Sequence, residues 1–260
     1  AIFLVYSFFR VDGARLVAEP GLQNYRRFFT DAIYLPVFLR TCVLCLEVAG
    51  LTLLLGYPVA YLLAALRGRK KYVLLLLLVV PLLMSYIIKI YAIRSILGGT
   101  GFLNRALMWL GVIDQPSMLF VFNLNAVLLT LTVLLLPFAI LPIFLSLERI
   151  PRGLIEAAAD LGGTAAHTFL LVVLPLSLPG VIAATTFVFV LALGDFLTPL
   201  MVGGQSGFTF GRIIYSQFGT AFNWPFGAAL SMILAAAVMA TIALGAWLGG
   251  RGAAWRGGPP

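Results

Sequence analysis

Long apolar runs set the strongest limit on how this chain can fold, because each is at least as long as the roughly 20 residues that a helix needs to cross a bilayer. The runs cover approximately residues 36–66, 72–96, 118–147, 169–202 and 224–248. Charged residues make up only 10% of the sequence and hydrophobic residues 62%, whereas a soluble domain carries about 25% charged residues. Water cannot solvate this much apolar surface, so we expect an all-α, polytopic membrane protein.

The first nine residues form a shorter apolar stretch that ends at Arg10. Such a stretch is too short to span a bilayer, so we interpret it as the outer half of a first helix whose start is missing from the sequence. No cleavable signal peptide is visible. Together with the longer runs, this stretch predicts about six transmembrane helices that form a single membrane domain over residues 1–260.

Basic residues gather in the connections that would lie on one side of the membrane. The formal net charge is +8, and residues 67–71, Arg149 with Arg152, and Arg251 with Arg256 fall on the same side when six spans are counted. Four arginines depart from this pattern in the first external loop: Arg10, Arg15, Arg26 and Arg27. Lys and Arg are enriched in cytoplasmic loops, where they face anionic headgroups. The charge therefore predicts cytoplasmic termini and a lipid partner rather than a nucleic acid.

The segments between and within the spans carry weaker signals. Residues 21–30 combine aromatics with arginines, so we expect a helix in the membrane interface. Residues 98–114 should form a looped region with a short helix, and residues 203–223 a loop. Prolines inside spans remove a backbone donor and bend a helix, and we expect the fifth span to be interrupted at Pro175 and Pro179. Such kinks favour a transporter over a simple anchor.

One polar segment between two spans carries the clearest functional signal. It reads Glu156-Ala-Ala-Ala-Asp160-Leu-Gly162 and continues to Val172-Val-Leu-Pro175. Glu156 and Asp160 would lie one turn apart on one face of a short cytoplasmic helix. The alanines between them would keep that helix slim, and Gly162 would permit a close turn or a C-cap. A slim helix with an acidic face outside the membrane is suited to docking in a groove of another protein.

This segment resembles the signature loop of binding-protein-dependent ABC importer permeases. The pattern is Glu-Ala-Ala, three residues, Gly, nine residues, an aliphatic residue, one residue, and Leu-Pro, with Val172 where the family usually has Ile. The resemblance implies a type I importer permease, in which the loop at about 149–167 is a coupling helix seated in a cleft of a cytoplasmic ATPase. The alternative is an ordinary interhelical loop. The residues that we expect to couple to the ATPase are Glu156, Ala157, Ala158, Asp160, Gly162, Leu174 and Pro175.

The same resemblance implies a set of partners in the bacterial inner membrane. A periplasmic solute-binding protein would deliver the solute, and a second, non-identical permease would complete the pore. The sequence contains no Walker-type motif, so two separate ATPase subunits would bind ATP and Mg, and this chain would hold no cofactor. ATP binding would draw the coupling helices together and open the pore outward, and hydrolysis would reset it.

Further stretches resemble the first permease of spermidine/putrescine importers. They are residues 85–92, 97–104, 193–199 and 223–225, and Gly203 with Gly204. Lys89 stands where that group commonly has Arg. The resemblance implies a polyamine as the solute. Relatives that handle opines, phosphonates or ferric iron share these motifs, so those solutes stay open as alternatives.

Ionisable residues within or near the expected spans are candidates for the translocation path, because an ionised group in hydrocarbon costs about 2.5–3.5 kcal/mol or more. Asp195 could attract a polyamine, or it could be a structural group bonded to backbone or to a neighbouring hydroxyl. Lys89 and Arg94 would repel a polyamine unless they pair with acids such as Asp114 or turn to the interface. Glu47 fits a structural role. Tyr and Trp can hold amines by cation–π contact. The path candidates are Asp195, Lys89, Glu47 and Tyr86.

The sequence offers no catalytic or metal-ligating set. The only histidine, His167, is expected at the cytoplasmic border, and Cys42 and Cys45 sit in an apolar run as packing residues. A membrane enzyme would need a convergent nucleophile, base or metal cluster. A secondary transporter would show paired repeats and broken midplane helices, and it would not need the segment from Glu156 to Pro175. We therefore expect a transport subunit without catalytic residues or a bound metal.

Overall fold

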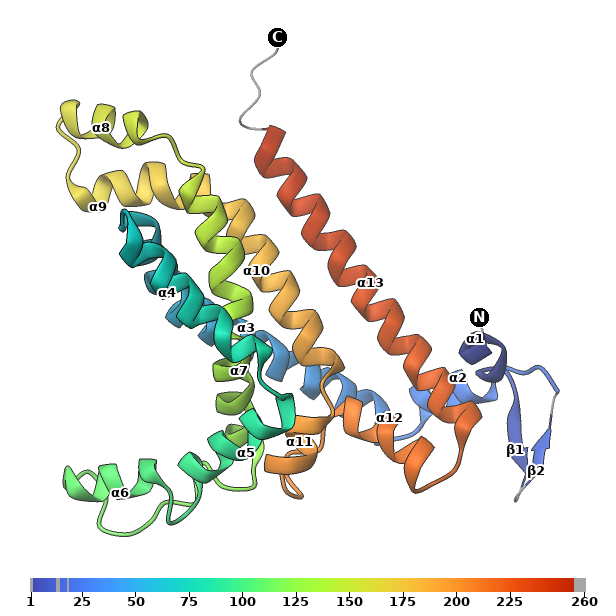
Figure 1. The fold of residues 1–260 in the computed structure, drawn as a ribbon. Coiled ribbons are helices and arrows are strands. Elements are labelled where there is room, and N and C mark those ends of the chain that lie inside the picture. Colours follow the sequence, from blue (N-terminus) through green and yellow to red (C-terminus); the bar gives the residue numbers. More distant parts are fainter. Residues whose placement is uncertain (1, 13–14, 18, 255–260) are drawn as a thin grey trace. The chain divides into compact units, whose positions relative to one another are not determined.

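The computed structural model of this chain describes residues 2–12, 15–17 and 19–254, and most of these are helical. The expectation of an all-α protein is confirmed. Strands β1 (Arg10–Asp12) and β2 (Arg15–Val17) pair antiparallel, with Arg10 opposite Val17. The long helices are α3 (Tyr34–Ala65), α7 (Leu124–Glu148), α10 (Leu174–Gly194) and α13 (Trp224–Ala254), as Figure 1 shows. The shorter elements are α1 (Ile2–Tyr6), α2 (Gln23–Thr30), α4 (Arg69–Val79), the 3₁₀ turn η1 (Val80–Leu83), α5 (Tyr86–Leu97), α6 (Phe102–Trp109), α8 (Arg152–Asp160), α9 (Ala165–Thr168), the π-helical turn η2 (Phe169–Val173), α11 (Leu197–Val202) and α12 (Phe210–Gly219).

Four helical stretches in the described part of the chain are long and apolar enough to cross a membrane, and a fifth span exists if α4 and α5 count as one. Of the remaining expected span, residues 2–6 form α1, which is too short to cross a bilayer. Ala1 and Arg256, which belong to the expected first helix and to the expected cytoplasmic tail, lie outside the described residues. The polytopic helical architecture is thus confirmed, with four or five of the six expected spans.

The expectation of one continuous third span over residues 72–96 is wrong. The helix α4 tightens into η1 at Val80, and the chain leaves helical geometry at Met84, where φ is −76° and ψ is 150°. A new helix, α5, begins at Tyr86. Pro81 lies at the start of η1 and has no N–H to give to the preceding turn, which explains why the helix does not continue.

The expected interruption of the fifth span at Pro175 and Pro179 is also wrong, because the helix runs from Ala165 to Gly194 without a break. The π turn η2 ends at Val173, two residues before Pro175, and its wider geometry accommodates the proline ring, which would clash in a regular helix. The chain breaks instead after Gly194. There the Asp195 carboxylate accepts hydrogen bonds from the backbone N–H groups of the next turn, and such local bonds compete with helix continuation.

The connecting segments match the expectations only in part. The interfacial segment and the region after Gly98 do form the short helices α2 and α6. Residues 203–223, expected as a loop, contain the helix α12. Phe210 and Ile213 lie three positions apart on this helix and are both buried. Packing of that apolar face therefore overrides the polar and glycine-rich character of the surrounding sequence.

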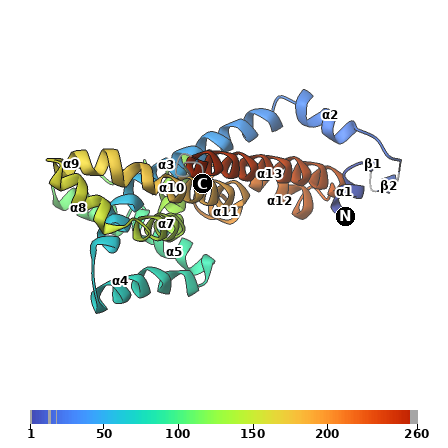
Figure 2. The same ribbon diagram turned by 90° about the horizontal axis from the view of Figure 1, so that it is seen from above.

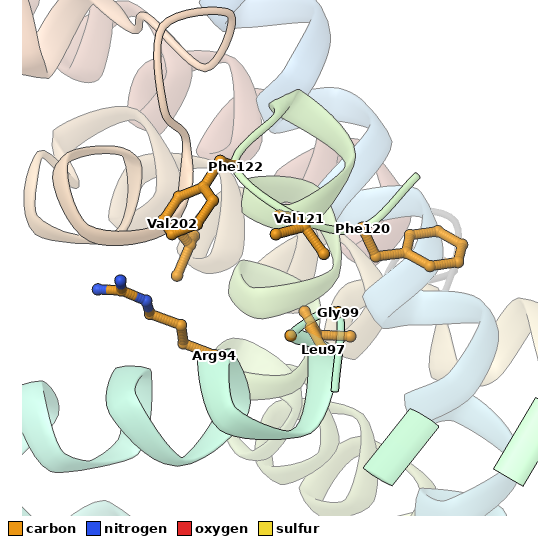
Figure 3. A pocket seen from close by; sticks show the side chains of 9 residues that line it. Arg94, Leu97, Gly99, Phe120, Val121, Phe122 and Val202 are labelled. Carbon is orange, nitrogen blue, oxygen red and sulfur yellow. The ribbon is translucent and has the colours of Figure 1, made fainter. Parts of the chain in front are cut away.

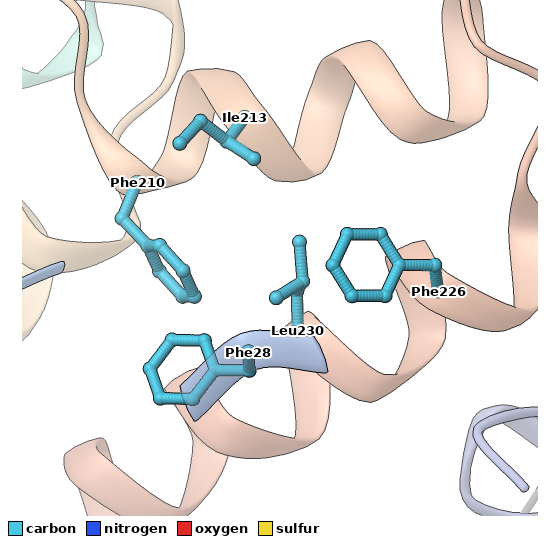
Figure 4. Packing of buried hydrophobic residues seen from close by; sticks show 5 residues of the cluster. All are labelled: Phe28, Phe210, Ile213, Phe226 and Leu230. Atoms are coloured by element: carbon cyan, nitrogen blue, oxygen red, sulfur yellow. The ribbon is translucent and has the colours of Figure 1, made fainter. Parts of the chain in front are cut away.

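The described chain divides into two compact units, and the first comprises residues 1–48, 86–131 and 190–240. Its core gathers buried apolar side chains from α2, α12 and α13, with Phe28 packed edge-on against Phe210 at a centroid distance of 5.9 Å (Figure 4). The five core residues are Phe28, Phe210, Ile213, Phe226 and Leu230. The Phe210 backbone N–H is bound by the Thr41 hydroxyl at 2.9 Å. This core fixes α12 against the first half of α3.

The second unit comprises residues 49–85, 132–189 and 241–260, of which 255–260 are not described. The Tyr57 hydroxyl lies 2.8 Å from Ser177 Oγ, and the rings of Tyr57 and Tyr61 contact the edge of Phe169 in η2. Gly180 lies so close to Ser146 that any side chain would collide with it. These contacts hold α3, α7 and α10 together beneath α8 and α9. The helices α3, α7, α10 and α13 contribute to both units, and the single membrane domain stays a prediction.

Candidate functional site

The expected coupling segment forms a short and exposed helix, α8, which begins after Pro151. None of its side chains is buried within this chain. Glu156, Ala157 and Asp160 are exposed, and Ala158 is half-buried. The acidic pair therefore lies one turn apart on a slim helix, as the sequence predicts.

The end of α8 is a glycine cap of the Schellman type. The N–H of Gly163 donates to the Ala158 carbonyl at 3.0 Å, and the N–H of Gly162 donates to the Ala159 carbonyl at 2.9 Å. Gly162 has a φ of +82°, a left-handed conformation that glycine adopts without strain. The predicted C-cap at Gly162 is confirmed, and the cap leaves Leu161 with 90% of its surface exposed.

Two residues of this turn escape the sequence reasoning. A Cβ at Gly163 would lie 2.7 Å from the Ala158 carbonyl oxygen, so this position of the cap leaves no room for a side chain. Thr164 then caps α9, because its side chain accepts a hydrogen bond from the His167 backbone N–H at 3.3 Å. The pair Gly162-Gly163 followed by Thr is itself a readable signal for one helix ending and another beginning.

The second half of the motif joins this helical hairpin to a membrane span. The helices α8 and α9 lie side by side (Figures 1 and 2), and α8 also contacts η2. Leu174, half-buried, and Pro175, exposed, form the first two residues of α10, directly after η2. The structure thus anchors the exposed helix through α9 and η2 to α10, and a movement of α8 would reach the span through a continuous helix.

Two of the four path candidates meet in a hydrogen-bonded network in the first unit. The Tyr86 hydroxyl donates to Asp195 Oδ2 at 2.6 Å and lies 3.1 Å from the buried Thr198 Oγ1. Tyr86 begins α5 after one helix break, and Asp195 occupies the other break, after α10. The network therefore joins the two places where the chain leaves regular helix inside apolar sequence.

Asp195 is held firmly by its own surroundings. Its Oδ1 accepts from the backbone N–H of Leu197 at 2.9 Å and from that of Thr198 at 3.3 Å. The structural alternative raised by the sequence, a carboxylate bonded to backbone and to a hydroxyl, describes these contacts well. The side chain nevertheless stays half-exposed. Since a carboxylate has about four acceptor positions, one remains for a further donor.

The two cations of α5 rest on aromatic rings and not on acids. Lys89 Nζ lies 5.5 Å from the centroid of the Tyr86 ring, and the Arg94 guanidinium lies 4.9 Å from that of Phe122. Pairing with Asp114, one of the alternatives that the sequence left open for these cations, is absent among the ion pairs of the described residues. Arg94 borders a hollow of about 160 Å³ and extends toward Phe122 and Val202 (Figure 3). Cation–π contacts thus stabilise both charges.

The sequence-based choice of path residues included Glu47 and omitted Thr198. Glu47 is exposed on α3 and takes no part in the network around Tyr86 and Asp195. Thr198, missed by the sequence analysis, lies inside that network. The available signal was an Asp shortly before a short apolar helix, a position that often caps a helix start. The described residues contain no group of three or more His, Cys, Asp or Glu that could hold a metal ion.

Comparison with known proteins adds a family assignment to this geometry. Residues 52–247 match the family described as "Binding-protein-dependent transport system inner membrane component". The spermidine/putrescine transport system permease protein PotB of Escherichia coli (strain K12) is 38% identical over 229 residues, 88% of this chain and 82% of that protein. The inner membrane ABC transporter permease protein YdcU of the same strain is 34% identical over 242 residues, 87% of this chain and 76% of that protein.

A solved structure shows the same fold at low sequence identity. It is the bacterial alginate ABC transporter in complex with an alginate pentasaccharide-bound periplasmic protein, with a TM-score of 0.68 and 16% identity over 86% of this chain and 81% of that chain. An identity this low supports the fold alone. The likeness therefore extends to the fold of this chain and not to its solute.

Proposed function

This chain belongs to the binding-protein-dependent transport system inner membrane components, and from that membership we propose that it forms half of the pore through which an importer moves a polyamine into the cytoplasm. It is a multi-pass permease of the bacterial inner membrane and a transport subunit rather than an enzyme. The observation that carries the choice of solute is the 38% identity to a spermidine/putrescine permease over 88% of the chain.

The network around Asp195 supports a cationic solute. Its carboxylate is oriented by two backbone N–H groups and by Tyr86, so little reorganisation is needed to accept a further N–H donor. An ammonium beside this carboxylate could also contact the Tyr86 ring, as the Lys89 ammonium does within the chain. Asp195 and Tyr86 are thus proposed as path residues.

Lys89 would weaken the binding of an amine at the proposed site. Its positive charge lies beside the same aromatic ring and partly offsets the attraction between Asp195 and an amine. A transport path must bind its solute strongly enough for entry and weakly enough for exit. We therefore propose that Lys89 keeps amine binding at Asp195 transient.

The proposed partners follow from exposed surfaces and from the family. The helix α8, with no side chain buried in this chain, offers its acidic face to an ATPase, and ATP and Mg would be bound by two such subunits. A second, non-identical permease would complete the pore, and a periplasmic binding protein would deliver the solute. The structurally similar alginate transporter was solved with such a periplasmic protein.

An anionic solute is the competing candidate, and the charges of α5 favour it. Lys89 and Arg94 are both cationic, and a molybdenum transport permease of Haemophilus influenzae is 32% identical over 158 residues, 59% of this chain and 66% of that protein. If the solute were an anion, Lys89 would replace Asp195 as the principal path residue.

Uptake by the complete importer in vesicles tests the proposal. The vesicles would contain this permease with its second permease and ATPase, with ATP inside and the binding protein outside. We expect saturable, ATP-dependent accumulation of spermidine or putrescine and none of molybdate. Uptake of molybdate without polyamine uptake would overturn the proposed solute while leaving the permease assignment in place.

A further inference from the structure

A hollow of about 360 Å³ lies in the second unit, at the end that the basic loops assign to the cytoplasm. It opens between the end of α3, the start of α4, the end of α7 and the start of α8. Three cations border it, Arg67, Lys71 and Arg152, together with the single acid Glu148. The remaining wall is apolar or aromatic, and Tyr61 and Ile155 belong to it. The hollow therefore has a charged part and an apolar part.

Only one of the three cations that border this hollow forms an ion pair with an acid in the described part of the chain. Lys71 forms an ion pair with Glu148 and lies 5.0 Å from the centroid of the Phe144 ring. Its side chain is only 13% exposed, so these contacts account for its ammonium. Among the described residues, neither Arg67 nor Arg152 forms an ion pair or a side-chain hydrogen bond. Two guanidinium groups thus remain to attract an anion.

Guanidinium groups bind phosphate oxygens in bidentate fashion, and basic pockets between transmembrane helices on the cytoplasmic side bind anionic lipid headgroups. We propose that this hollow binds an anionic phospholipid, with its headgroup phosphate between Arg67 and Arg152. A free phosphate would make no use of the apolar wall, whereas a lipid fills both parts.

The surface next to the hollow offers a place for the acyl chains. On α3, Leu62 is 64% exposed, and on α4, Tyr72 and Leu76 are 70% and 63% exposed. These side chains belong to apolar helical stretches that would face lipid. We expect the acyl chains of the proposed lipid to lie along this exposed apolar surface of α3 and α4.

A lipid bound at Arg152 would also affect the exposed helix α8. Arg152 is the first residue of α8, and Ile155, which also borders the hollow, lies one turn later. A lipid phosphate on Arg152 would therefore steady the start of the helix that is expected to meet the ATPase.

Lipid binding to the intact importer in nanodiscs tests this site. The probe is fluorescent phosphatidylglycerol, which is titrated into discs of phosphatidylcholine. The measured quantity is lipid binding, independent of transport activity. The test variant is Arg67→Ala with Arg152→Ala. The matched control is Arg69→Ala with Arg149→Ala, which removes two cations from the same loops without touching the hollow. Arg67→Lys with Arg152→Lys retains both charges and checks that folding is intact.

Each cation near the membrane surface contributes roughly fivefold to the binding of an anionic lipid. We expect the test variant to bind phosphatidylglycerol roughly 30-fold more weakly and the control variant to bind much as the unaltered importer does. The lysine variant should bind with intermediate affinity, because it keeps both charges but loses the bidentate contact. Excess inorganic phosphate should leave the lipid bound. An equal loss in the test and control variants would show general charge attraction and overturn the site. Displacement by inorganic phosphate would show a free-anion site and overturn the lipid assignment.

Discussion

Tyr86 donates a 2.6 Å hydrogen bond to Asp195, so that the first residue of α5 is fastened to the break that follows α10. The two residues are 109 positions apart in the sequence. Both breaks interrupt apolar stretches, and irregular backbone within a membrane is tolerated where it is buried in protein or borders a wet cavity. The bond therefore marks the place in the first unit where a polar path is best supported.

Replacement of Asp195 by Asn separates a path role from a structural one. The amide oxygen of Asp195→Asn can still accept from the Leu197 and Thr198 backbone N–H groups, so the complex should assemble normally. Because a hydrogen bond to a charged group contributes about 1.5–3 kcal/mol, spermidine uptake should fall about tenfold or more. The measurement is initial uptake rate beside the yield of assembled complex. Unchanged uptake would assign Asp195 to structure alone.

The hydroxyl and the ring of Tyr86 can be tested apart. Tyr86→Phe removes the bond to Asp195 but keeps the aromatic face on which Lys89 rests. Tyr86→Leu removes both. We expect a severalfold loss of uptake in the first variant and a larger loss in the second, because a cation–π contact contributes about 0.5–2 kcal/mol. Equal uptake in the two variants would show that no amine contacts the ring during transport.

The pair formed by α4 and α5 decides the topology of the chain. Lys70 and Ser206 are both exposed. Between these two residues the chain passes through the α4–α5 pair, α7 and α10. If the pair crosses the bilayer, Lys70→Cys and Ser206→Cys lie on opposite sides. If it enters and leaves on one side, the two lie on the same side.

Labelling with a membrane-impermeant maleimide in intact cells distinguishes these arrangements. The background would carry Cys42→Ala and Cys45→Ala to remove the native thiols. We expect labelling at position 206 from outside and at position 70 only after the cells are opened. Labelling of both positions from the same side would contradict the six-span arrangement.

Local patterns predicted part of this fold well, and contacts between distant segments explain what they missed. The α8 helix and its cap at Gly162 follow from residues within one stretch of a dozen positions. The effect of Pro175 depends on the π turn before it, which no proline rule foresees. Likewise, the bond from Tyr86 to Asp195 depends on how two helix breaks meet. The sequence positions of Tyr86 and Asp195 do not show that these two breaks lie close together in space.

Gly162 allows the docking surface of α8 to be probed at a single position. A Cβ there would meet nothing within 4 Å in this chain, but the φ of +82° strains any residue with a side chain. The strain amounts to about 1–2 kcal/mol and should be similar for Gly162→Ala and Gly162→Leu. The two variants therefore share the backbone cost and differ only in bulk on the exposed face.

ATPase activity of the purified complex in lipid, with and without loaded binding protein, measures the consequence of that bulk. A Cβ at position 162 meets nothing within 4 Å in this chain. If the ATPase cleft covers Gly162, we expect the bulk of a leucine side chain to collide with the cleft. We expect Gly162→Ala to retain most of the stimulation by loaded binding protein and Gly162→Leu to lose it, with both permeases present in the membrane in normal amounts. Equal loss in both variants would attribute the effect to backbone strain. Normal stimulation in Gly162→Leu, with the ATPase still bound, would place the coupling contact away from the end of α8.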